Sequence, residues 1–179
     1  MAITIVQPKP SRSSLEHLPP KFYYINNGDF SIVWSNVVVF IIGHVLFGQA
    51  MVLVLNGSLH PYTWMYTVFL ASLVAIGVTG GVHRHWSHRS YDASLPLKYL
   101  LMVGQTLSGQ NSIYVWARDH RVHHKWSDTD GDPHNTRRGF FFAHCGWLMT
   151  KKHPELMLKS AKLDFSDLKR DQVVKFQFE

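Results

Sequence analysis

A chain of 179 residues with a net charge of +6 at pH 7 has the length of one ordinary domain, yet its apolar residues are concentrated in residues 30–82. The mean hydropathy of −0.07 hides this concentration, because polar stretches on both sides dilute it. Although a pI near 9.5 suggests nucleic acid, two uncharged stretches of membrane-spanning length are better explained by membrane topology and contact with anionic lipid or cofactor. We therefore expect no nucleic-acid partner.

The lone Cys145 excludes an internal disulfide and is interpreted as a packing residue.

The first 28 residues are rich in Pro, Ser and Asn and lack periodicity, so we expect residues 1–28 to form a flexible cytosolic arm. Phe22, Tyr23 and Tyr24 are candidates for an aromatic anchor at a membrane interface. The arm contains no recognisable cleaved signal peptide, so the first span would insert as its own signal.

Two stretches without charged residues follow, residues 31–55 and residues 62–82. At 1.5 Å of rise per residue they form helices of about 37 and 31 Å, enough to cross a hydrocarbon core of about 30 Å. Three basic residues precede the first stretch, none lies between the two, and the other fifteen of the eighteen follow residue 82. The positive-inside bias therefore predicts an all-α integral membrane hairpin of two transmembrane helices, with both flanks cytosolic.

The C-terminal part, residues 83–179, is predicted to be a cytosolic and interfacial helical cap that carries the histidines. Residues 95–107 are apolar but too short to cross a membrane, so we expect an interfacial or re-entrant helix there. The segments that follow are a second helix, a polar loop, an apolar stretch and a charged stretch of open structure, at residues 113–125, 127–139, 140–150 and 154–179.

Eight of the twelve histidines lie between His83 and His144, and they form two groups. In the second group His120 lies about 60° from His123 and 40° from His124 on a helix, so we expect these three imidazoles to converge on one point. Imidazole suits Fe, Zn, Cu or Ni, so the pattern predicts a metal without choosing one.

The first group poses a geometric problem, because His83 and His88 are five residues apart, or about 140° around an α-helix. They cannot both reach one ion from a straight helix. Either the helix ends or kinks between them, or they bind two neighbouring ions of a dinuclear centre.

The chain does not contain the sequence motifs of other common metal sites. The chain has no His-Glu-x-x-His, no Cys pair and no Glu-x-x-His, and the acidic loop at residues 128–139 lacks the Gly and the Glu of a calcium site. Asp119 and Asp128 are instead candidates to accept the far N–H of a ligand histidine. The isolated histidines are interpreted as ordinary polar side chains: His17, His44, His60 and His153.

Three stretches resemble the histidine-box region of animal acyl-CoA Δ9 desaturases: residues 80–91 (GGVHRHWSHRSY), 116–125 (WARDHRVHHK) and 132–148 (DPHNTRRGFFFAHCGWL). The resemblance implies that residues 29–179 are the N-terminal part of a fatty acid desaturase domain in the endoplasmic reticulum membrane, with two iron ions as cofactor. Enzymes of this family use O2 and electrons from cytochrome b5 to place a cis double bond in a saturated fatty acyl-CoA.

The resemblance also assigns roles to individual residues. Ligand roles pass to five histidines, His83, His88, His120, His123 and His124, but not to His85, which stands where the family usually has Leu, or to His134. Substrate roles pass to Asn111, Trp116, Arg118, Asp119, Lys151 and Lys152. The two lysines stand at a basic pair that meets CoA phosphate, and a solvated basic surface is the alternative interpretation. Apolar residues within 95–107, together with Trp116, are expected to wall the acyl tunnel.

Members of this family continue into a third and a fourth span that carry further ligands. We therefore expect the present chain alone to be a partial or alternatively terminated product that is inactive. Two alternatives stay open: a related histidine-box hydroxylase, and a non-catalytic chain that associates with the membrane or with full-length desaturase.

Overall fold

The computed structural model describes residues 31–178, and within this range the regular structure is helical apart from one isolated bridge between Ile32 and Thr150. The elements are, in order, α3 (Trp34–Leu55), α4 (Pro61–Ile76), η1 (Gly77–Ser87), α5 (Leu95–Leu107), α6 (Ile113–Lys125), η2 (Thr136–Arg138), α7 (Phe140–His144), η3 (Gly146–Met149), α8 (Pro154–Ser160), α9 (Ser166–Arg170) and α10 (Gln172–Phe178). The predicted all-α hairpin with a helical cap is confirmed. The predicted N-terminal arm and its aromatic anchor lie outside the described residues.

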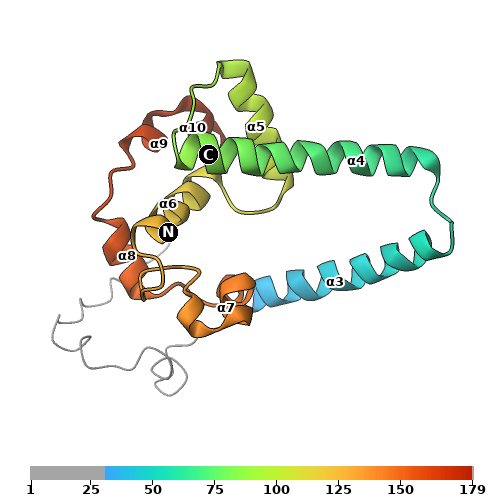
Figure 1. The fold of residues 1–179 in the computed structure, drawn as a ribbon, viewed down its shortest axis with the longest axis horizontal. Helices are drawn as coiled ribbons and strands as arrows, with labels where there is room; N and C mark the ends of the chain where they lie inside the picture. Colours follow the sequence, from blue (N-terminus) through green and yellow to red (C-terminus); the bar gives the residue numbers. More distant parts are fainter. Residues whose placement is uncertain (1–30, 179) are drawn as a thin grey trace, which may run out of the picture.

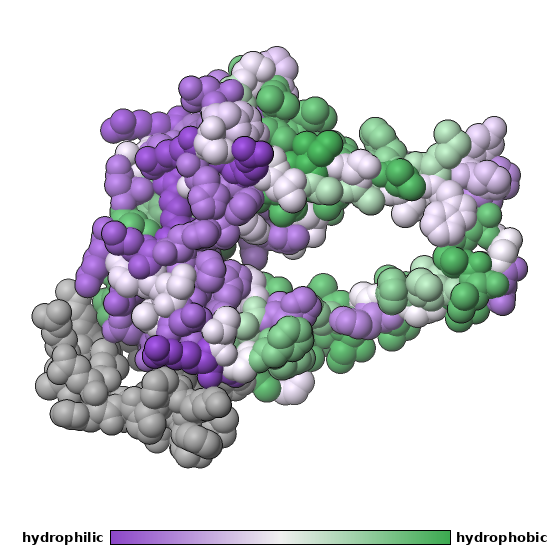
Figure 2. Space-filling model, viewed as in Figure 1, coloured by the Kyte–Doolittle hydropathy of each residue, from purple (hydrophilic) through white to green (hydrophobic). Residues whose placement is uncertain are grey.

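Helices α3 and α4 form two long arms that extend from a helical body and join at the loop of residues 56–60 (Figure 1). Neither helix has a buried residue, so apolar side chains cover both arms, whereas hydrophilic residues gather on the body (Figure 2). α4 begins at Pro61, where His60 accepts a hydrogen bond from the Tyr62 amide at 3.3 Å. The helix that starts with α4 continues through η1 to Ser87, beyond the uncharged stretch that ends at residue 82.

The second arm enters the body as η1, an 11-residue π-helix that crosses α5 at very short range. A Cβ added at Gly77 would lie 2.4 Å from the Gly104 carbonyl carbon, and one added at Gly104 would lie 2.4 Å from the Leu73 carbonyl oxygen. The two backbones can approach this closely only because neither residue has a side chain. The glycines therefore fix where α5 crosses the end of the second arm.

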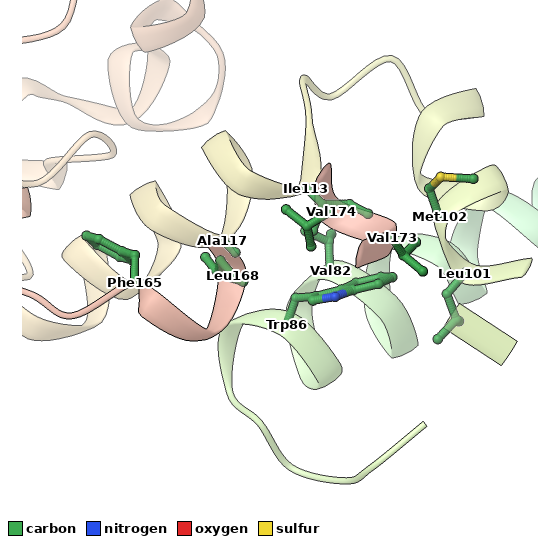
Figure 3. Close-up of a cluster of buried hydrophobic side chains, with 10 residues drawn as sticks. All are labelled: Val82, Trp86, Leu101, Met102, Ile113, Ala117, Phe165, Leu168, Val173 and Val174. Carbon is green, nitrogen blue, oxygen red and sulfur yellow. The ribbon is translucent and has the colours of Figure 1, made fainter. Parts of the chain in front are cut away.

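A single apolar cluster joins η1 to α5, α6, α9 and α10 (Figure 3). Trp86 of η1 is 3% exposed and lies among these residues, and Leu101 of α5 and Ile113 of α6 are also buried. α9 and α10 close the cluster with Leu168, Val173 and Val174. The C-terminal segment, whose structure the sequence left open, is thus helical and part of the core.

The body end of α3 is attached to η3 by backbone pairing. The Val33 amide donates to the Met149 carbonyl at 2.8 Å, and the Lys151 amide donates to the Ser31 carbonyl at 2.9 Å. The Asn36 side chain adds a bond to the Leu148 carbonyl at 2.6 Å. These contacts place the first arm beside the segment that follows α7.

Substitution Gly104→Ala is expected to destabilise the protein by about 1–3 kcal/mol, because the new methyl group would overlap the backbone of Leu73. Thermal unfolding in detergent micelles measures the effect. Gly48→Ala on α3 is the matched control, since nothing lies within 4 Å of its added Cβ. Equal melting temperatures for the two variants would contradict the close crossing.

Candidate metal centre and adjoining cavity

Four histidines meet where the end of η1 faces α6. One ring nitrogen from each of His83, His88, His120 and His124 lies within 4.8 Å of all the others. The Nε2 atom of His88 is 3.2 Å from that of His83 and 3.1 Å from that of His120, and the His120 and His124 Nε2 atoms are 3.0 Å apart. His88 and His124 are exposed, whereas His83 and His120 are partly buried.

The π-helical turn resolves the geometric problem of His83 and His88. The His88 amide donates to the His83 carbonyl at 3.1 Å, a bond that spans five residues instead of four. With one more residue in the turn, positions five apart lie above each other, and the two rings pack edge to face at 4.6 Å. Both side chains therefore reach the same point, His83 from within η1 and His88 from its C-cap. The helix ends between the two histidines, which was one of the alternatives that the sequence left open.

The other two histidines of the cluster come from one face of α6. His120 and His124 are four residues apart, and their ring centroids are 4.5 Å apart. The Ser112 side chain caps the start of α6 by accepting from the Val115 amide at 3.3 Å. The predicted helix of residues 113–125 is confirmed. Of the three imidazoles expected to converge on one point, only those of His120 and His124 do.

Hydrogen bonds between the neutral rings cannot account for all of these short nitrogen–nitrogen contacts. A neutral imidazole nitrogen carries either one proton or one lone pair, but the Nε2 atoms of His88 and His120 each contact two neighbours. Burial, followed by the charges of His124, His83 and His88, lowers the pKa of His120 to about 3. Burial also lowers the pKa of His88 and His124, and neighbouring histidines add to the effect. The lowered pKa favours the neutral form of His88, His120 and His124, which is the form in which imidazole binds a metal.

Three of the nitrogen separations suit neighbouring ligands of one metal ion. With metal–nitrogen bonds of about 2.1 Å, the Nε2–Nε2 separations of 3.0–3.2 Å would correspond to ligand–metal–ligand angles of roughly 90–100°. A regular tetrahedral site would separate the nitrogens by about 3.4 Å.

His123, the remaining predicted ligand, does not join this cluster. Its Nδ1 contacts the Asp132 carboxylate at 2.8 Å, and its ring packs against that of His134 at 5.2 Å. Asp132 is 4% exposed and also accepts from the Asp128 and His134 amides at 2.8 and 2.9 Å. This contact leaves Nε2 of His123 as the nitrogen that could bind a metal.

The aspartate that supports a histidine is therefore Asp132, which the sequence did not single out for this role. Asp128 instead accepts from the Thr136 hydroxyl at 2.6 Å, and Asp119 pairs with Arg118 and Lys152. A loop brings Asp132 and His123 together, so the helical spacing of residues in the sequence does not predict their contact.

The other histidines have ordinary contacts. His85 is buried against Trp86 and contacts the Tyr91 carbonyl through Nδ1 at 2.9 Å, away from the four-histidine cluster. The Nδ1 atom of His44 contacts the Phe40 carbonyl at 2.7 Å. His60 and His153 cap α4 and α8. His17 lies outside the described residues.

A cavity of about 630 Å³ adjoins the cluster, with His120 in its wall. Three of the six predicted substrate residues line it, Asn111, Trp116 and Asp119, whereas Arg118, Lys151 and Lys152 do not. Arg118 and Lys152 reach the cavity indirectly, because both bind the Asp119 carboxylate. The predicted wall of residues 95–107 is not part of this cavity, which α3 and the α7–η3 segment line instead with Val39, Phe40, Ala143, Trp147 and Leu148.

The comparisons with known proteins identify the family. Residues 59–175 match the family model described as fatty acid desaturase, so the chain belongs to the fatty acid desaturase family. The chain is similar to acyl-CoA desaturase 1 of Tachysurus fulvidraco, with 53% identity over 82% of this chain and 43% of the relative. It is also similar to stearoyl-CoA desaturase 4 of Mus musculus, with 46% identity over 94% of this chain and 45% of the relative, and to human stearoyl-CoA desaturase, with 48% over 81% and 40%. The chain spans less than half the length of these curated relatives.

His120→Ala is expected to weaken Zn²⁺ binding by more than about 100-fold, because it removes a nitrogen that lies 3.1 Å and 3.0 Å from two others of the cluster. Even the outer partners of ligands contribute about 10- to 100-fold. His85→Ala is the matched control, since His85 lies apart from the cluster. Competition with a chromophoric chelator measures both affinities. Equal losses in the two variants would contradict the assignment.

Acid is expected to destabilise the metal-free chain. The unfolded chain protonates His120 near its ordinary pKa of 6.5 and the folded chain near 3, so between these values the unfolded state binds more protons. Stability should fall as the pH is lowered from 6.5 toward 3 and be insensitive to this residue above 6.5. His120→Gln should flatten the pH dependence of thermal unfolding; a slope identical to that of the unsubstituted chain would contradict the low pKa.

Proposed function

We propose that this chain provides part of the active site of an acyl-CoA desaturase, which inserts a cis double bond, at the Δ9 position, into a saturated fatty acyl-CoA. The observation that carries the proposal is the contact between the four-histidine cluster and the 630 Å³ cavity, which share His120. Trp116 also lines the cavity, and its ring lies 4.7 Å from that of His120. A substrate in the cavity would thus lie next to the metal-binding nitrogens.

The proposed cofactor is a pair of iron ions. The four-histidine cluster would hold one ion, and His123, supported by Asp132, would provide a ligand to the second. Iron supplies the oxidising power, with O2, that no side chain has for an unactivated CH2 group. We propose cytochrome b5 as the electron donor and the endoplasmic reticulum membrane as the location, with the N-terminus and the histidines on the cytosolic side.

The chain's own residues would bind and orient the substrate. An acyl chain has no polar group near its middle carbons, so its position depends on apolar walls and on an anchored head. Val39, Phe40 and Leu148 provide such walls. Asn111 also lines the cavity. Its φ is 67°, and its carbonyl accepts a hydrogen bond from the Gln105 side chain at 2.7 Å.

The charged end of the substrate would lie near the basic residues around Asp119. Asp119 is 5% exposed and pairs with Arg118 at 2.8 Å and with Lys152. Two cations around one buried carboxylate leave a net positive charge, which favours CoA phosphate. Lys151, the next residue, would extend this basic surface.

The test is incubation of the full protein with stearoyl-CoA, O2, NADH, cytochrome b5 and its reductase, followed by mass spectrometry of the fatty acids. The proposal expects a product with one cis double bond between carbons 9 and 10. A hydroxylated product would favour the hydroxylase alternative, and no product together with iron near zero would favour the non-catalytic one.

Leu148→Trp is expected to weaken stearoyl-CoA binding at least about tenfold, because the larger side chain fills the cavity that Leu148 lines. Equilibrium binding of radiolabelled stearoyl-CoA measures the effect. Leu46→Trp on α3, 58% exposed and outside the cavity, is the matched control. Unchanged binding by Leu148→Trp would remove this cavity as the acyl site.

A further inference from the structure

Arg121 lies on α6 between two histidines of the cluster, and it uses all five of its N–H donors. Nε donates to the Ser87 carbonyl at 3.1 Å, and Nη2 donates to the Trp86 carbonyl at 2.5 Å. The Asp167 carboxylate accepts from Nη1 at 3.0 Å and from Nη2 at 2.6 Å, and the Asp164 carbonyl accepts the last N–H at 3.4 Å. The side chain is only 12% exposed, so this geometry is firmly held.

The carbonyls that Arg121 contacts are the last two of η1. The His83 and His85 carbonyls accept from the His88 and Arg89 amides, each at 3.1 Å. In the described residues no backbone amide donates to the carbonyls of Trp86 and Ser87. The guanidinium group takes that place, and its positive charge suits the negative end of a helix.

Asp167 also binds Arg89, the residue that follows His88 in the chain. The Arg89 side chain donates to Asp167 from Nε at 2.9 Å, and its Nη2 lies 2.7 Å from Oδ1. Arg89 has a φ of 52°. This left-handed backbone conformation is rare for residues other than glycine, and it often ends a helix. The ion pair compensates for this conformation and fixes the exit of the chain from η1.

We propose that Arg121 and Asp167 are positioning residues for the metal centre. Together they hold the backbone before and after His88, which keeps its Nε2 at 3.2 Å from that of His83 and 3.1 Å from that of His120. A purely structural ion pair between α6 and α9 would stabilise the fold but leave the affinity for metal unchanged. The inference rests on the metal centre of the proposed function.

The experiment is a Co²⁺ titration of the full chain in detergent micelles, followed by visible absorption, which reports the coordination of the ion. Asp167→Asn is expected to weaken Co²⁺ binding about 10- to 100-fold and to change the spectrum toward that of His88→Ala. Arg121→Lys should also weaken Co²⁺ binding. All three donors of a lysine lie on one nitrogen atom, so they cannot reach two carbonyls and a carboxylate at once. Asp92→Asn, an exposed loss of the same charge, should bind like the unsubstituted chain.

The inference requires that Asp167→Asn weaken Co²⁺ binding by displacing His88. In a His88→Ala background, addition of Asp167→Asn should therefore change Co²⁺ affinity less than about twofold. An undiminished loss in that background, or wild-type affinity and spectrum for both Asp167→Asn and Arg121→Lys, would overturn the inference. Absence of Co²⁺ binding by the unsubstituted chain would instead contradict the metal centre itself, so the two failures are distinguishable.

Discussion

The five-residue hydrogen-bonded turn of η1 is the constraint on which the site depends. In a regular α-helix His83 and His88 would point in different directions, and α6 alone would offer two convergent rings. The π-helical turn places both histidines over α6, so two elements supply two rings each. The close crossing of Gly77 and Gly104 holds this segment against α5, and the apolar cluster around Trp86 holds it against α6.

The surroundings of the site disfavour protonation of His88, His120 and His124. Burial and the neighbouring histidines disfavour protonation of His120, and the Asp132 carboxylate contacts His123, outside the four-histidine cluster. Burial alone would raise the pKa of Asp167, but hydrogen bonds from Arg121 and Arg89 outweigh it and hold that pKa well below its ordinary value. One ring nitrogen from each of the four histidines is thus left within 4.8 Å of the others, and the ion pairs of Asp167 lie beside the cluster.

The sequence predicted those features that depend on local pattern. Uncharged stretches of spanning length predicted both arms, and the four-residue spacing on α6 predicted the pairing of His120 with His124. The rest depends on contacts distant in the chain. A π-helix has no simple residue signature, so the meeting of His83 with His88 required the packing of η1 against α5. Asp132 reaches His123 through a loop, and the role of Asp167 depends on a helix in a segment whose structure the sequence left open.

We infer that four imidazoles from η1 and α6 share one metal ion. The most direct measurement is X-ray absorption fine structure at the iron edge of the chain loaded with Fe²⁺. The account predicts a nitrogen-rich first shell, with the outer-shell scattering of about four imidazole rings at metal–nitrogen distances near 2.1 Å. A first shell of oxygen with one imidazole or none would contradict it.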